Sequence, residues 1–190
     1  MAVGCGFWLK NLRINLTDRT VVVEEIQEEF LKEFIGGAGA AAVYLKREVP
    51  PECGALDPGN LLIFATGPFQ ASKISGSAKF TVVTRSPLTG LFVDSAAGAN
   101  WGILFKRTGF DFLTISGKSS TPVYLNITDN QAEILPAEDM WGMNALAVTD
   151  KLKELHPGAS VTAIGQAGEN QVALSCIMVD GFSAVGRGGT

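Results

Sequence analysis

The chain has 190 residues, of which 46% are hydrophobic and 18% are charged, with a formal net charge of −4. This composition fits one folded domain and excludes a disordered or collagen-like chain. The acidic balance and the scattered Lys and Arg argue against a nucleic-acid surface. No apolar run reaches the roughly 18 residues of a membrane helix. The first 13 residues carry their charges after their apolar part, the reverse of a signal peptide, so we expect a cytoplasmic protein.

The hydrophobic pattern of the first 120 residues predicts an opening hairpin, two helices, and then strands around a third helix. In the hairpin, Leu12, Ile14 and Leu16 alternate with polar residues, which is typical of a half-buried strand. The expected strands are residues 7–16, 20–25, 61–66, 79–84, one beginning at 91–94, and 110–116. The expected helices are 28–35, ended by Gly36 and Gly37, then 38–49, stopped by two prolines, and 100–107.

The second part of the chain predicts another hairpin, one amphipathic helix and two final strands. The hairpin strands are residues 122–127 and 131–135, the helix is 144–155, and the final strands are 161–164 and 172–179. The run GQAGEN between the final strands predicts a loop. The single histidine, His156, precedes a proline at the helix end, which favours a capping or exposed position over catalysis. These elements together predict an α+β fold that is rich in β-structure.

The two hairpins indicate an internal duplication. The turn NLTD at residues 15–18 matches NITD at 126–129, and each hairpin precedes a helix, a short apolar strand ending in glycine, and another strand. We therefore predict two sheets related by a pseudo-two-fold axis, with a few flanking helices. A chance resemblance between the turns is the alternative. In a duplicated fold, residues 86–98 and 180–189 follow equivalent strands and would converge on one site.

The last stretch, residues 180–190, reads DGFSAVGRGGT and is the leading candidate for a binding site. Backbone without Cβ atoms can approach a ligand closely, and Arg187 can pair with a phosphate through two hydrogen bonds. The alternative is a glycine-rich tail that binds nothing. No strand or helix is expected after residue 179. We predict that residues 1–190 are one domain of a longer chain.

The three cysteines, Cys5, Cys53 and Cys176, are far apart and odd in number. Their spacing provides no metal-binding pair, no iron–sulfur motif and no disulfide framework. We interpret them as buried or incidental thiols.

Several runs, in order along nearly the whole chain, resemble the N-terminal domain of the tungsten-containing aldehyde ferredoxin oxidoreductases. They are residues 34–37, 67–68, 82–90, 109–111, 115–118, 122–124, 141–142, 164–170 and 186–189. No single run is decisive, but the set is specific. The resemblance implies a β-rich first domain of two sheets, which forms a base under a tungsten or molybdenum bis-pterin cofactor.

By the same resemblance, the full enzymes oxidise aldehydes to carboxylic acids and pass electrons through a [4Fe–4S] cluster to ferredoxin. The cluster cysteines belong to later domains, so this chain would seat the cofactor and would not be active alone. The expected partners are ferredoxin and the remaining domains of the parent chain, without nucleic acid or membrane. A homo-oligomer is compatible with this reading.

The resemblance also assigns site residues. In the family, a magnesium ion bridges the phosphates of the two pterins, and matching motifs place its backbone-carbonyl ligands at Ala96 and Ala184. Contacts to phosphate and pterin would fall on Lys79, Ala97, Gly98, Ser183, Val185, Gly186 and Arg187. Carbonyl oxygens suit a hard cation, and the charges of Lys79 and Arg187 would offset phosphate charge. No residue of this chain is assigned a catalytic role.

Three positions depart from the family pattern. The family often has arginine where Lys79 and Ser183 stand, and asparagine where Ala96 stands. A lysine neutralises phosphate but lacks the two-pronged guanidinium. Two further interpretations therefore stay open: a related tungsten–pterin reductase for a thioester or aromatic substrate, and a scaffold domain that has lost cofactor binding.

Overall fold

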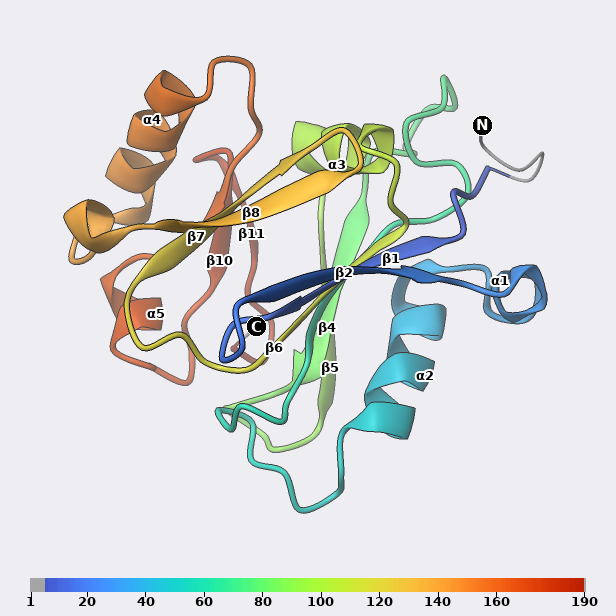
Figure 1. Cartoon of the computed structure of the whole chain (residues 1–190), viewed down its shortest axis with the longest axis horizontal. Coiled ribbons are helices and arrows are strands. Elements are labelled where there is room, and N and C mark those ends of the chain that lie inside the picture. The colour runs from blue at the N-terminus through green and yellow to red at the C-terminus, as the bar shows by residue number, and fades with distance from the viewer. Residues whose placement is uncertain (1–5, 190) are drawn as a thin grey trace.

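A six-stranded mixed sheet is the largest element of the computed structural model, which describes residues 6–189 (Figure 1). The strand order is β2-β1-β6-β3-β4-β5. The strands are β1 (Lys10–Asn15), β2 (Thr20–Glu25), β3 (Leu62–Ala65), β4 (Phe80–Arg85), β5 (Phe92–Ala97) and β6 (Phe112–Ser116). Strands β1 and β6 are parallel, and the other neighbours are antiparallel. The predicted opening hairpin, β1–β2, is confirmed.

At its centre the large sheet is covered on both faces, which explains why the central strand β3 is continuously apolar. On one face, α1 (Glu28–Phe34) and α2 (Gly37–Glu48) pack on Ile63, Val83 and Phe112. On the other face, Phe64 and Val82 pack with α3 (Asn100–Arg107) and with the strands near the C-terminus. Successive residues of a strand point to opposite faces, so one apolar run supplies two cores.

Two small sheets complete the fold. One is the hairpin β7 (Val123–Thr128) and β8 (Gln131–Pro136), and the other has the order β11-β10-β9. Its strands are β9 (Thr162–Ala163), β10 (Ile177–Val179) and β11 (Ser183–Val185). Buried residues of β10 and β11, and apolar residues of the hairpin, belong to the same core cluster as α3.

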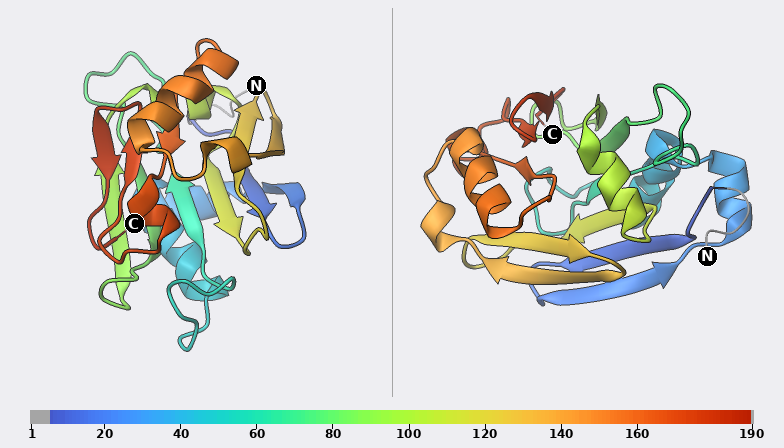
Figure 2. Two further views of the ribbon diagram at one scale, coloured as in Figure 1. Left: turned by 90° about the vertical axis from the view of Figure 1, so that its left-hand side faces the viewer. Right: turned by 90° about the horizontal axis from the view of Figure 1, so that it is seen from above.

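The remaining helices border the small sheets. They are the 3₁₀ turn η1 (Glu138–Met140), α4 (Ala145–Leu155) and the short α5 (Gln166–Glu169). Asn144 caps α4, because its side-chain oxygen accepts a hydrogen bond from the amide of Ala147 at 2.9 Å. Helices α4 and α2 lie at opposite ends of the molecule (Figures 1 and 2).

A buried ion pair joins the end of α3 to the residue before β6, and hydrogen bonds from Trp8 link it to the segment before β1. The ammonium of Lys106 contacts the carboxylate of Asp111, and both side chains are at most 5% exposed. The carboxylate also accepts a hydrogen bond from the amide of Trp8 at 2.9 Å, and the Trp8 indole donates to the carbonyl of Lys106 at 2.7 Å. Burial lowers the pKa of Lys106, and the negative charge of Asp111 opposes that effect.

The C-terminal part differs from the sequence-based predictions at three places. The strand predicted over 172–179 is present only as β10, because residues before it form turns with bonds such as Ser175 N to Val172 O at 2.9 Å. Leu174, in those turns, is 70% exposed. The last stretch contains the strand β11, where no further strand was expected. The loop predicted at GQAGEN contains α5.

The predicted α+β class is confirmed. The arrangement differs from the predicted pair of sheets related by a pseudo-two-fold axis. The structure has one large sheet and two small ones, and a duplication is not shown by it. Across residues 6–189, no helix has the length and apolar character needed to cross a membrane.

Candidate cofactor site

The edge strands β5 and β11 meet at the centre of the candidate site. The hydroxyl oxygen of Ser95, in β5, accepts hydrogen bonds from the amides of Gly186 at 3.1 Å and Arg187 at 3.5 Å. The hydroxyl of Ser86 donates to the carbonyl of Gly188 at 2.5 Å. Both serines are buried, at 5% and 0% exposure. The structure thus brings together the two segments that the sequence predicts to converge.

The backbone of Ala96 faces the open edge of the large sheet. In an antiparallel pair, residues that exchange hydrogen bonds alternate with residues whose backbone groups point away. The amide of Ser86 donates to the carbonyl of Leu91 at 2.8 Å, which fixes this alternation for β4 and β5. Ala96 lies opposite Thr81, and these two residues do not exchange hydrogen bonds. Its carbonyl therefore points away from β4.

The carbonyl of Ala184 also points away from its neighbouring strand, in the sheet with the order β11-β10-β9. The amide of Asp180 donates to the carbonyl of Val161 at 2.8 Å, so the Met178–Ala163 pair also exchanges hydrogen bonds. Met178 thus directs its backbone groups to β9. Ala184 lies opposite Met178 across β10 and β11, and its carbonyl points away from β10. Each predicted carbonyl ligand therefore lies on an edge strand and faces outward.

The start of α3 follows closely after Ala96 in the chain. Gly98 follows β5, and a Cβ built on it would meet no atom within 4 Å. The N-cap residue, Ala99, provides no side-chain hydrogen bond to the helix. The first amides of α3 therefore point out of a helix end without a side-chain cap, an arrangement that favours an anion.

The other predicted residues lie on β4, β5 and β11 or next to these strands. Exposed Lys79 precedes β4, whose Phe80 lies opposite Ala97. Ala97 and Val185 are buried in the core, so only their backbones can reach a ligand. Ser183 and Gly186 are half-buried, and Arg187 is exposed. Within residues 6–189 no three His, Cys, Asp or Glu side chains group to hold a metal ion.

Close packing accounts for the glycines after β11. A Cβ built on Gly189 would lie 1.8 Å from the carbonyl oxygen of Ala173, and one on Gly186 would lie 2.5 Å from the Cβ of Cys176. Gly188 has a φ of +66°, which disfavours residues with a side chain. The GRGG backbone is therefore fixed against its neighbours.

The sequence analysis did not identify the two serines that hold the segments together. Ser86 belongs to the run RSPLTG, where its hydroxyl also accepts from the amides of Leu88 and Thr89, at 3.1 and 3.0 Å. A serine before proline in a turn indicates such capping. Ser95 has no comparable signal, because its partners are 91 and 92 residues away.

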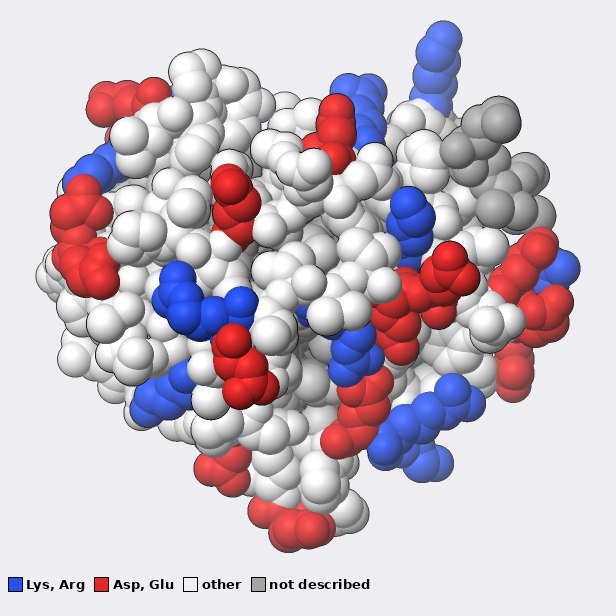
Figure 3. All heavy atoms as spheres, in the orientation of Figure 1, with Lys and Arg blue, Asp and Glu red and all other residues white. Residues whose placement is uncertain are grey.

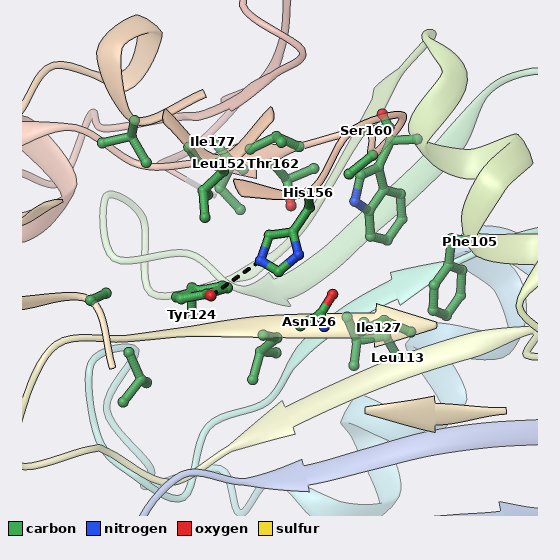
Figure 4. Close-up of a pocket in the computed structure, with 18 of the residues that line it drawn as sticks. Phe105, Leu113, Tyr124, Asn126, Ile127, Leu152, His156, Ser160, Thr162 and Ile177 are labelled. Carbon is green, nitrogen blue, oxygen red and sulfur yellow. Dashed lines mark hydrogen bonds between the residues drawn. The ribbon is translucent and has the colours of Figure 1, made fainter. Parts of the chain in front are cut away.

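The histidine lies elsewhere, whereas one thiol residue, Cys176, packs against Gly186. Cys53 is half-buried and Cys176 is exposed, while Cys5 lies outside the described residues. His156 ends α4, and its Nε2 lies 3.1 Å from the hydroxyl of Tyr124 (Figure 4). On the face in Figure 3, charges of both signs are interspersed.

Comparison with known proteins places the chain among oxidoreductases. Residues 11–190 match the family described as "Aldehyde ferredoxin oxidoreductase, N-terminal domain". The chain belongs to this family. It is 38% identical over 187 residues to a tungsten-containing aldehyde ferredoxin oxidoreductase of Pyrococcus abyssi, covering 97% of the chain and 31% of that protein. The sequence-based identification of the aldehyde ferredoxin oxidoreductase N-terminal domain is thereby confirmed.

Other relatives of the chain are named for different activities. The chain is 32% identical over 197 residues to the WOR-like subunit of an aliphatic sulfonate oxidoreductase of Pyrococcus furiosus, covering 95% of the chain and 31% of that protein. It superposes with a TM-score of 0.94 and 34% identity on the BamBC active-site complex of benzoyl-coenzyme A reductase, solved with 1,5-dienoyl-CoA. That match covers 97% of this chain and 28% of the other. The chain spans about a third of these relatives' length.

Proposed function

We propose that the chain seats a tungsten bis-pterin cofactor, or its molybdenum counterpart, as the N-terminal domain of an aldehyde ferredoxin oxidoreductase. The observation that carries this proposal is the pair of outward carbonyls, Ala96 and Ala184, on two edge strands joined through Ser95. Backbone carbonyls are ligands that Mg²⁺ accepts. The open space at Gly98 and the start of α3 suits a phosphate next to that ion.

In this proposal the residues of the chain bind and orient the cofactor. The carbonyls of Ala96 and Ala184 would hold a magnesium ion, which would offset phosphate charge of the cofactor. The first amides of α3 and the backbone of Gly98, Ser183, Val185 and Gly186 would contact phosphate and pterin, with Ala97 giving only backbone. Lys79 and Arg187 would neutralise phosphate charge. When bound, the cofactor would supply the two-electron chemistry of aldehyde oxidation.

The rest of the activity would depend on polypeptide outside this chain. Electrons would leave through a [4Fe–4S] cluster in later domains to ferredoxin, in the cytoplasm. The relatives of the chain are tungsten-containing aldehyde ferredoxin oxidoreductases, which supports tungsten as the metal and ferredoxin as the electron partner. The substrate pocket would also lie in the later domains.

The second candidate is a related reductase for a thioester or aromatic substrate. The TM-score of 0.94 to the benzoyl-coenzyme A reductase complex supports this candidate. The sequence identity to that complex is 34%, which is close to the 38% identity to an aldehyde enzyme. Both candidates use this domain in the same way.

Anaerobic purification of the full-length protein tests the proposal. We expect about one tungsten or molybdenum atom per chain, a fluorescent oxidised pterin, and dye reduction with aldehydes. Reaction with an aromatic thioester and not with aldehydes would select the second candidate. A folded protein without heavy metal or pterin, from cells supplied with both, would contradict cofactor binding and leave the scaffold interpretation.

A further inference from the structure

The side chain of Gln70 carries a buried hydrogen-bond donor that has no partner. Gln70 lies in the connection between β3 and β4 and is 6% exposed. Among residues 6–189, its Nε2 is fully buried and forms no hydrogen bond. The Oδ1 of Asn60 is likewise unpaired, but that side chain is held by a bond from its Nδ2 to the carbonyl of Ala55 at 2.7 Å. Buried polar groups nearly always have a partner, so the donor of Gln70 needs an explanation.

The unpaired donor lies beside the first turn of α3. A Cβ built on Gly102, the third residue of this helix, would lie 2.6 Å from Nε2 of Gln70. The Cα–Cβ bond of a helical residue tilts toward the N-terminus of its helix. Nε2 of Gln70 therefore lies alongside the first turn and toward the helix start, which is the end that follows Gly98 in the chain.

Gly102 keeps this place free for the side chain of Gln70. The φ of Gly102 is not in the left-handed region, so the backbone does not require glycine at this position. Glycine inside a helix is also less stable than alanine. A side chain at Gly102 would meet Gln70 and, at 3.1 Å, the Cβ of Phe80. The glycine is therefore explained by the approach of the carboxamide to the helix.

The chemistry at the start of α3 calls for an anionic acceptor. The first amides of a helix have no acceptor within the helix, and Ala99 provides no side-chain cap. The N–H of the Gln70 carboxamide is a donor as well, so it cannot satisfy those amides. An oxyanion can accept from both kinds of donor, and the helix dipole favours its negative charge. Lys79 adds a positive charge next to Phe80, which borders the same place.

We propose that Gln70 is a further binding residue of the candidate cofactor site, and that its carboxamide N–H donates to a phosphate oxygen at the start of α3. The inference rests on the proposed function, because that phosphate belongs to the cofactor. Nε2 is fully buried in this structure, so the carboxamide has to turn toward the phosphate. The terminal torsion of a glutamine side chain is broad enough for this turn. Gln70 would hold the cofactor in place and would take no part in the reaction.

The variant Gln70→Met tests this inference in the full-length protein, purified anaerobically. Methionine has a similar length and no hydrogen-bond donor, so it removes the unpaired group while filling the same space. We expect the melting temperature of the cofactor-free variant to be unchanged or higher, because an unsatisfied buried donor destabilises the fold. We expect the loaded variant to lose tungsten and pterin at least about tenfold faster on dilution, which corresponds to one hydrogen bond to a charged group.

The two measurements together separate cofactor binding from a structural role of Gln70. A lower melting temperature of cofactor-free Gln70→Met, or its failure to fold, would overturn the inference. Either result would show that the carboxamide has a partner without the cofactor, such as a buried water. Unchanged loss of tungsten and pterin from the loaded variant would also overturn it. An unaltered protein that holds neither tungsten nor pterin would instead contradict the proposed function itself.

Two further variants complete the test. Gln70→Glu keeps the shape of the side chain but replaces the donor with a negative charge, so we expect it to lose the cofactor faster than Gln70→Met. Retention of tungsten and pterin by Gln70→Glu as in the unaltered protein would overturn the inference. Gln27 is exposed and makes no cap hydrogen bond to α1, which gives the matched control Gln27→Met. This control should change neither measurement, and a loss of cofactor equal to that of Gln70→Met would overturn the inference.

Discussion

At the scale of single residues, the Lys106–Asp111 pair has the largest expected effect on stability. Both side chains are buried, and Lys106 Nζ also lies 5.3 Å from the centre of the Phe7 ring. Removing one partner leaves an uncompensated buried charge, which typically costs about 3–5 kcal/mol. We expect Lys106→Met to lower the free energy of unfolding by that amount in urea denaturation.

An exposed pair provides the matched control for this variant. Lys151 contacts Asp139, whose side chain is 67% exposed. The bond to Lys151 lowers the pKa of Asp139, but a pair between solvent-exposed side chains contributes little to stability. Lys151→Met should therefore have little effect. Equal losses in the two variants would contradict the special role of the buried pair.

Tyr44 gives the fold an alkaline pH dependence. Burial raises its pKa from 10.0 to about 12, with a smaller contribution from the charge of Glu24. The folded state therefore disfavours the phenolate: its contribution to stability is complete below pH 10 and is lost as the pH rises to about 12. Allowing for partial exposure, about 1 kcal/mol should be lost over this interval. Tyr44→Phe should reduce this loss, as measured by denaturation at pH 9 and pH 11.5. A variant with the same pH dependence as the unaltered protein would contradict the role of Tyr44.

At the scale of elements, Ser95 connects β5 to the end of β11. Ser95→Ala leaves the amide of Gly186 without its acceptor, and an unsatisfied buried donor costs about 1–3 kcal/mol. We expect this loss of stability together with faster exchange of the peptide containing Gly186. Ser120, which is exposed, gives the control Ser120→Ala. Unchanged exchange at Gly186 in Ser95→Ala would show that the serine does not hold the two strands together.

Most elements could be predicted from the sequence because their periodicity is local. The helix at 100–107 was predicted with its observed bounds, and the strand at 20–25 likewise. The strand over 172–179 was wrong because an apolar run alone does not distinguish a strand from a turn whose side chains remain exposed. Strand β11 has three residues between glycine-containing segments, too few for a periodic pattern.

At the scale of the whole molecule, the sequence predicted that residues 86–98 and 180–189 converge, and the structure has them in contact through Ser86 and Ser95. The outward direction of the carbonyls of Ala96 and Ala184 could not be predicted. It depends on which pairs in each ladder exchange hydrogen bonds, and one residue of shift in register would reverse it. The assignment of ligands remains a prediction.

The cofactor content of a Gly98→Val variant tests the proposed site most directly. A Cβ at Gly98 meets nothing in this structure, and its φ is not in the left-handed region, so the fold should tolerate valine. In the full-length protein the same side chain would occupy the place of a phosphate. We predict an unchanged melting temperature of the metal-free protein, and at least about a tenfold loss of tungsten and pterin per chain, with a smaller loss for Gly98→Ala. Full tungsten and pterin content in a stably folded Gly98→Val protein would contradict the site.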